Sequence, residues 1–197
     1  IFNLNPKSQQ QGNLTGGAKL DDYEFDTYVD NTLWQIVQNS WAEIAANQND
    51  PNFINSLSPS FNLLRTEQDD GQPLEDESLK RWHENFQNLI NNNEYEKKDE
   101  LYEYNCLLLV NQSLLNIFNR ISRGELRVNE TLIEMLMNFN LFVTNISYFT
   151  YFTGEIYYTT QILDEIIYHC LQNYNEGTAL PDFFTPVTSF QELCNRL

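Results

Sequence analysis

Apolar residues recur every three or four positions along most of the chain, which is the spacing of amphipathic α-helices. Polar stretches containing Gly, Pro, Asn or Asp separate these runs. No stretch alternates apolar and polar residues between turn signals, as a half-buried strand would. The pattern therefore predicts an all-α fold of about seven helices. They are expected at residues 21–46, 51–57, 78–90, 100–122, 130–153, 155–174 and 188–197.

The predicted helix at 100–122 is apolar over more than half of its circumference, and the two helices that follow it are nearly as apolar. Helices of this kind are sandwiched between neighbours. Stacked layers of the armadillo or HEAT type, with a unit of about 40–47 residues, have this appearance. An irregular helical bundle accounts for the pattern almost as well, because no position repeats with matching residue identity. In either arrangement we expect Trp82, Phe118 and Ile167 to be mostly buried.

Local signals mark several of the helix ends. Asn129 stands where it can cap the helix that begins at residue 130. Ser189 or Thr188 can cap the last helix in the same way. Gly124 follows the basic last turn of the helix at 100–122 and suits a left-handed C-terminal position.

The distribution of polar residues suggests one folded domain with a flexible arm. Residues 1–20 have no period and are expected to form the arm. Residues 21–197 are expected to form a single all-α domain, with possible subunits at 21–64 and 76–197 joined by an acidic loop at 65–77. The chain begins with Ile rather than Met, so we expect it to be a fragment of a larger protein.

Composition and charge narrow the classes of partner. Hydrophobic residues make up 41% of the chain and aromatic residues 14%, which is enough for a sizeable core. The net charge is −17, from 28 acidic and 11 basic residues. Binding to nucleic acid or to an anionic membrane surface would need many more basic residues. The charge favours a protein partner with a basic or helical segment.

The cysteines indicate an intracellular protein, cytoplasmic or nuclear. Cys106, Cys170 and Cys194 are odd in number and show no C-x-x-C spacing. A secreted chain stabilised by disulfides would carry more of them. We expect reduced thiols that are buried on helices.

Four N-x-S/T sequons occur, at Asn13, Asn111, Asn129 and Asn145. The chain is asparagine-rich, and its 26 Asn residues would give about three such matches by chance. The sequons are therefore weak evidence for glycosylation. Asn111 and Asn145 lie in apolar helical patterns, where a glycan would block packing.

Residues 147–160 carry six aromatic rings and overlap the end of a long uncharged stretch, residues 135–154. That stretch could span a bilayer by length, but its Asn, Ser and Thr content and the lack of flanking basic residues argue against a membrane helix. We interpret the aromatic rings as core residues of a helix–turn–helix junction. The alternatives are a partner-binding surface or a small-molecule pocket lined by Tyr151, Tyr157 and Tyr158.

A second candidate for partner binding is a cluster of bases at Arg120, Arg123 and Arg127, after which no Lys or Arg occurs until Arg196. The simplest interpretation is that these arginines complement the negative end of a helix dipole. The alternative is an anchor for an acidic segment of a partner.

No pattern in the chain predicts a catalytic, metal or cofactor site. The two histidines, His83 and His169, are far apart, and His83 is expected to be a solvated or flanking residue. His169 and Cys170 are adjacent, so on a helix they point about 100° apart and do not form a dyad. The acidic stretch at 66–77 matches only part of a calcium-binding loop. Phosphate-binding glycine motifs are absent from the sequence.

The sequence therefore favours a non-catalytic scaffold or adaptor domain, with no cofactor, that binds another protein by its helical surface. The alternative is a helical regulatory or exchange-factor domain of a larger multidomain protein or enzyme.

Overall fold

The computed structural model describes residues 32–57, 77–91, 100–146 and 153–197, and this part of the chain contains seven helices and no strand. They are α2 (Leu33–Ala46), α3 (Pro51–Leu57), α4 (Glu77–Asn91), α5 (Glu100–Ser122), α6 (Glu130–Ile146), α7 (Thr153–Glu176) and α8 (Phe190–Cys194). The predicted all-α fold is confirmed. The expected arm lies outside the described residues, as does the acidic loop up to its last residue, Glu77, where α4 begins.

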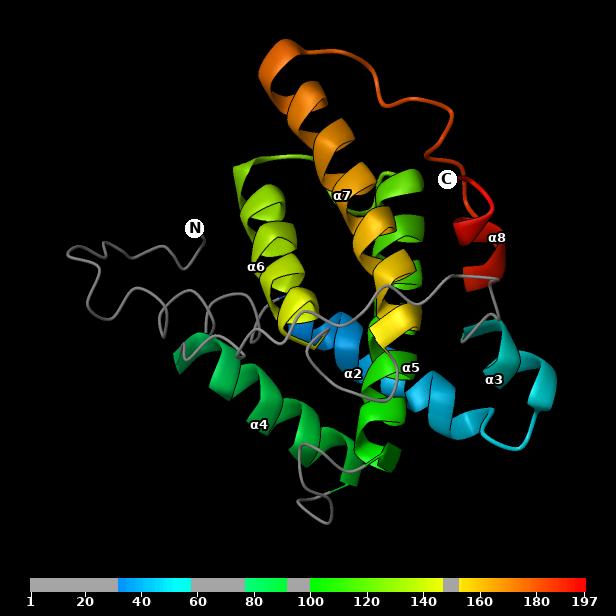
Figure 1. Cartoon of the computed structure of the whole chain (residues 1–197). Helices are drawn as coiled ribbons and strands as arrows, with labels where there is room; N and C mark the ends of the chain where they lie inside the picture. The colour runs from blue at the N-terminus through cyan, green and yellow to red at the C-terminus, as the bar shows by residue number, and fades with distance from the viewer. Residues whose placement is uncertain (1–31, 58–76, 92–99, 147–152) are drawn as a thin grey trace.

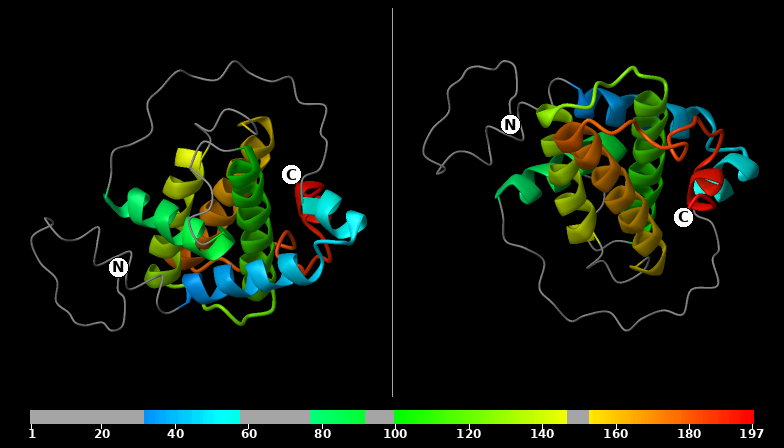
Figure 2. Two further views of the ribbon diagram at one scale, coloured as in Figure 1. Left: turned by 90° about the horizontal axis from the view of Figure 1, so that it is seen from below. Right: turned by 90° about the horizontal axis from the view of Figure 1, so that it is seen from above.

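Helices α5, α6 and α7 run side by side in alternating directions (Figure 1). Helix α2 packs along α5, and α6 packs along α7. The short helices α3 and α8 contact each other and lie on the side of α5 away from α6 (Figure 2). This arrangement fits both a helical bundle and the repeat-like layering expected from the sequence.

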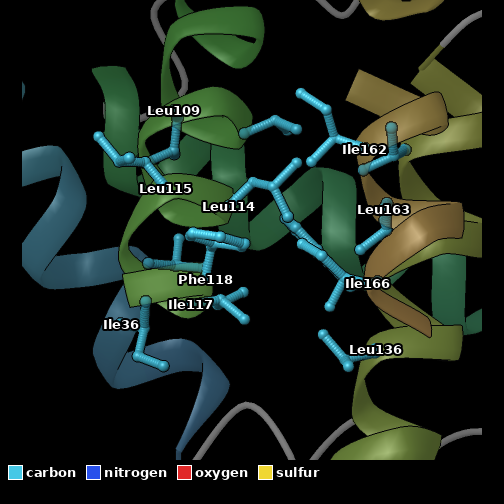
Figure 3. Packing of buried hydrophobic residues seen from close by; sticks show 14 of the residues in the cluster. Ile36, Leu109, Leu114, Leu115, Ile117, Phe118, Leu136, Ile162, Leu163 and Ile166 are labelled. Carbon is cyan, nitrogen blue, oxygen red and sulfur yellow. The ribbon is translucent and has the colours of Figure 1, made fainter. Parts of the chain in front are cut away.

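The core is built around α5, whose side chains are buried on nearly every side. Its apolar residues from Leu107 to Val110 are at most 3% exposed. Farther along the helix, Leu114 and Phe118 are fully buried between the apolar side chains of α2 and α7 (Figure 3). The expected burial of Trp82, Phe118 and Ile167 is confirmed, with exposed fractions of 0%, 0% and 9%.

Two asparagine side chains connect α5 to the helices around it. Asn111 Nδ2 donates to the carbonyl oxygen of Leu57, the last residue of α3, over 2.6 Å. The Asn111 Oδ1 accepts the hydroxyl of Thr159 on α7 over 2.5 Å. Asn116 Nδ2 donates to Ser40 Oγ on α2 over 2.9 Å. Because Asn111 is only 1% exposed, its hydrogen bonds replace water that cannot reach it.

The helix ends follow the signals in the sequence. Asn129 Oδ1 accepts the backbone N–H of Leu132 over 2.9 Å, and Ser189 Oγ accepts that of Glu192 over 3.1 Å. Gly124 ends α5 with φ = 76°, a conformation that side chains disfavour. The Gly124 N–H donates to the Ile121 carbonyl, and the Glu125 N–H donates to the Arg120 carbonyl. These two hydrogen bonds form a Schellman motif.

The buried Asn111 offers a test of this arrangement. Asn111→Leu removes the partner of the Leu57 carbonyl and of the Thr159 hydroxyl. We expect the free energy of unfolding to fall by about 1–3 kcal/mol for each buried group left unpaired. Urea denaturation would measure this loss.

Thr159→Val provides the control for that variant. The double variant Asn111→Leu/Thr159→Val has no hydroxyl left without a partner. The double variant should therefore lose less stability than the sum of the losses measured for the two single variants. Additive losses would show that the two side chains do not interact.

Candidate functional site

The three thiols lie in the core and are not poised for chemistry. Cys106, Cys170 and Cys194 are unpaired and buried, as the sequence predicted. Burial raises the pKa of Cys170 and of Cys194 to about 12, and it raises the pKa of Cys106 as well. Because the thiolate is the nucleophilic form, these side chains are poor nucleophiles at neutral pH.

The expectation that His83 is a solvated or flanking residue was wrong. The side chain is buried, at 5% exposed, and its Nε2 forms a 2.7 Å hydrogen bond with Asn145 Oδ1. Its ring packs against Phe142 of α6, with 5.2 Å between the ring centroids. The signal was present in the sequence: His83 follows Leu79 by four residues and precedes Phe86 by three, so it falls on the apolar stripe of α4.

His169 and its neighbour Cys170 occupy different environments. Cys170 is fully buried, whereas His169 is half-buried and its Nε2 lies 3.3 Å from Glu165 Oε2. The ring of His169 packs near Phe183, with 5.6 Å between the centroids. The two side chains therefore do not form a catalytic pair.

The described residues form neither a metal cluster nor a membrane span. In this part of the chain no group of three or more His, Cys, Asp or Glu side chains could hold a metal ion. None of the described helices combines the length and the hydropathy that a membrane span requires.

The three tyrosines predicted as possible partner-binding residues are not brought together by what the structure describes. Tyr151 lies outside the described residues. Tyr157 belongs to α7, but its side chain also lies outside them. Tyr158 is half-buried on α7, next to the fully buried Thr159. The aromatic site stays a prediction.

The predicted arginine cluster lies at the junction between α5 and α6. Arg120 is half-buried in the last turn of α5, and its Nε lies 3.6 Å from Glu125 Oε1. Arg123 and Arg127 are exposed in the connection that follows. The position of Arg120 fits the expected role at the negative end of the helix dipole. The two exposed arginines leave binding of an acidic segment as a prediction.

Sequence reasoning missed an exposed apolar patch on α6 and α7. Met137 and Leu141 of α6 are 51% and 47% exposed, and Tyr168 of α7 is 52% exposed. Asn140 Nδ2 donates to Asp164 Oδ1 over 3.3 Å and joins the two helices at the surface. Met137 lies one turn before Asn140, and Tyr168 lies one turn after Asp164. Because α6 and α7 are antiparallel (Figure 1), Met137 and Tyr168 lie on the same side of the Asn140–Asp164 hydrogen bond along the boundary between the two helices.

We call the surface formed by Met137, Leu141, Asp164, Glu165 and Tyr168 the α6–α7 face. Asp164 and Glu165 are exposed, and neither helix contains a Lys or Arg. Large exposed apolar side chains beside exposed acidic ones are therefore the main chemical feature of this face, although Glu165 lies 3.3 Å from His169 Nε2. Such a surface creates a negative potential around an apolar contact area.

Glu134 of α6 lies half-buried, and this partial burial raises the pKa of its carboxyl group to about 8. Because its ordinary pKa is 4.5, the folded state binds this proton more tightly than the unfolded chain. The free energy of unfolding contributed by Glu134 should therefore fall as the pH rises from about 4.5 to about 8.

Glu134→Gln removes this titration. We expect the variant to be more stable than the unmodified chain at pH 9, and the difference to shrink toward pH 5, as measured by urea denaturation. Glu84→Gln, at an exposed position of α4, is the matched loss of one acidic side chain. A stability difference for Glu134→Gln that does not vary with pH would contradict the assignment.

Comparison with known proteins adds no family to this description. No family model, no curated protein and no solved structure matches the chain.

Proposed function

We propose that the chain is a non-catalytic, all-α interaction domain that binds another protein through the α6–α7 face. The observation that carries this proposal is the exposure of Met137, Leu141 and Tyr168 on two adjoining helices. Surface apolar residues scattered singly need no explanation, whereas several large ones on adjoining helices, beside polar residues, favour an interaction site. Tyr and Met are also enriched at protein interfaces.

The chemistry of the face favours a partner with a basic amphipathic helix. Apolar side chains on one side of such a helix would pack on Met137 and Leu141, and the flexible Met can adapt to their shape. Lys or Arg residues beside them would lie near Asp164 and Glu165. The net charge of −17 would steer a basic partner toward the face and disfavour acidic ones.

The proposed site of action is inside the cell, in the cytoplasm or the nucleus. Support comes from the three cysteines, all of which are unpaired and buried. Nucleic acid is disfavoured as the partner because phosphate contacts need a concentration of Lys and Arg.

The test is differential capture from a cell lysate at low and at moderate salt, with bound proteins quantified by mass spectrometry. The face variant is the triple substitution Met137→Ser, Leu141→Ser and Tyr168→Ser. We expect the face variant to capture about tenfold less of the partner than the unmodified chain does, since a loss of 1.4 kcal/mol in binding free energy corresponds to a tenfold loss of affinity. Moderate salt should release the same partner from the unmodified chain.

The matched control is the double variant Tyr174→Ser and Leu197→Ser. These side chains are 47% and 52% exposed and lie outside the α6–α7 face. The control should capture the partner as the unmodified chain does. Equal capture by the face variant, with its thermal unfolding unchanged, would contradict the proposed function.

A further inference from the structure

The C-terminal segment, residues 178–197, is braced by its own side chains. Arg196 Nη1 donates to the carbonyl oxygens of Phe183 and Thr185, over 2.8 and 2.6 Å. The Oε1 of Glu192 accepts the backbone N–H and the hydroxyl of Thr188, each over 3.0 Å. Together with the Ser189 cap, these bonds close the loop onto α8. The segment therefore has internal contacts that do not depend on the rest of the protein.

The body of the protein holds this segment through Asn119 of α5. Asn119 Nδ2 donates to the carbonyl oxygen of Val187 over 2.9 Å, and its Oδ1 accepts the Val187 N–H over 2.8 Å. One side-chain amide thus pairs with both backbone groups of one residue, as a neighbouring strand would. Asn119 is 8% exposed and Val187 is 4% exposed, so both bonds are shielded from water.

Apolar contacts complete the docking site for the segment. The ring of Phe184 stacks on Phe118 of α5, with 5.4 Å between centroids and 16° between the ring planes. Phe190 is only 1% exposed. Helix α8 packs against α3, α5 and α7. The segment is therefore seated as a peptide would be in a groove, with apolar anchors and a backbone clamp.

The connection between this segment and α7 lies on the outside of the molecule. Helix α7 ends at Glu176, the next residue Gly177 has φ = 68°, and residues 174–179 are all exposed. Figure 1 shows the chain running from this end of α7 to α8, which lies beside α3. Asn173 Nδ2 donates to the Thr178 carbonyl over 2.6 Å at the start of the connection. Changes of direction here would expose no core residue.

We propose that the docking site on α5 also accepts the C-terminal segment of a second copy of this chain, giving an exchanged dimer. The second copy is the occupant because its segment carries the same Val187 backbone, Phe184 ring and Phe190 ring that the site already holds. Exchange of one element makes the same contacts between chains as within one chain. The covalent connection favours the closed monomer at low protein concentration, and exchange grows as the concentration approaches the effective concentration of the tethered segment.

Two complementary variants test this exchange. Asn119→Leu damages the docking site and leaves the segment intact, whereas Val187→Asp damages the segment and leaves Asn119 intact. Each variant alone should have the 23.2 kDa mass of one chain by light scattering after size exclusion. An equimolar mixture at about 100 µM, within reach of millimolar effective concentrations, should contain a species of twice that mass. A mixture of the two folded variants that stays at the mass of one chain would overturn the proposal.

Hydrogen exchange of the unmodified chain keeps the test decisive if a variant fails to fold. The amides of α8 should exchange through a partial opening that leaves the amides of α5 protected. If the α8 amides exchange only when α5 does, the segment does not leave its site in the folded chain, and this result would contradict exchange between folded copies. This result would not affect the proposed partner binding, because the α6–α7 face shares no residue with the docking site.

Discussion

The burial of α5 on nearly every side is the constraint on which the rest of the structure depends. A helix in this position cannot satisfy its polar side chains with water, so a buried polar side chain on it is costly unless a neighbouring segment supplies a partner. Asn111 has partners on α3 and α7, and Asn119 pairs with the backbone of the C-terminal segment. The apolar residues of α5 supply most of the burial. Its asparagines fix which segments lie where, because amide hydrogen bonds are directional and apolar contacts are not.

This organisation explains why the α6–α7 face is available. Helix α6 packs chiefly on α7, and α4 lies against another part of it through the contacts of Trp82 and His83 with Phe142. The described residues leave Met137 and Leu141 uncovered. Partial burial raises the pKa of Glu134 on the same helix to about 8.

Local features of the sequence were sufficient for the helices and for several of their ends. The period of apolar residues placed all seven helices of the described part, and Asn129, Ser189 and Gly124 act at the ends as expected. Long-range pairs could not be predicted, since Asn111 and Leu57 are 54 positions apart and nothing in a local pattern links them. The α6–α7 face was missed because α6 is apolar on most sides, which suggested complete burial of the helix. Which side is covered depends on where α4 and α7 dock, and periodicity does not contain that information.

The two proposed contacts use different parts of one rigid centre. The docking site for the C-terminal segment is on the side of α5 near α3, and α6 lies away from that side (Figure 2). Each copy in an exchanged dimer would therefore keep its own α6–α7 face. Two faces in one particle can bind two basic segments of a single partner, and the second contact then forms at a high effective concentration. Weak individual contacts, as expected for a small apolar patch in a strong negative field, would gain affinity from this pairing without any new side-chain interaction.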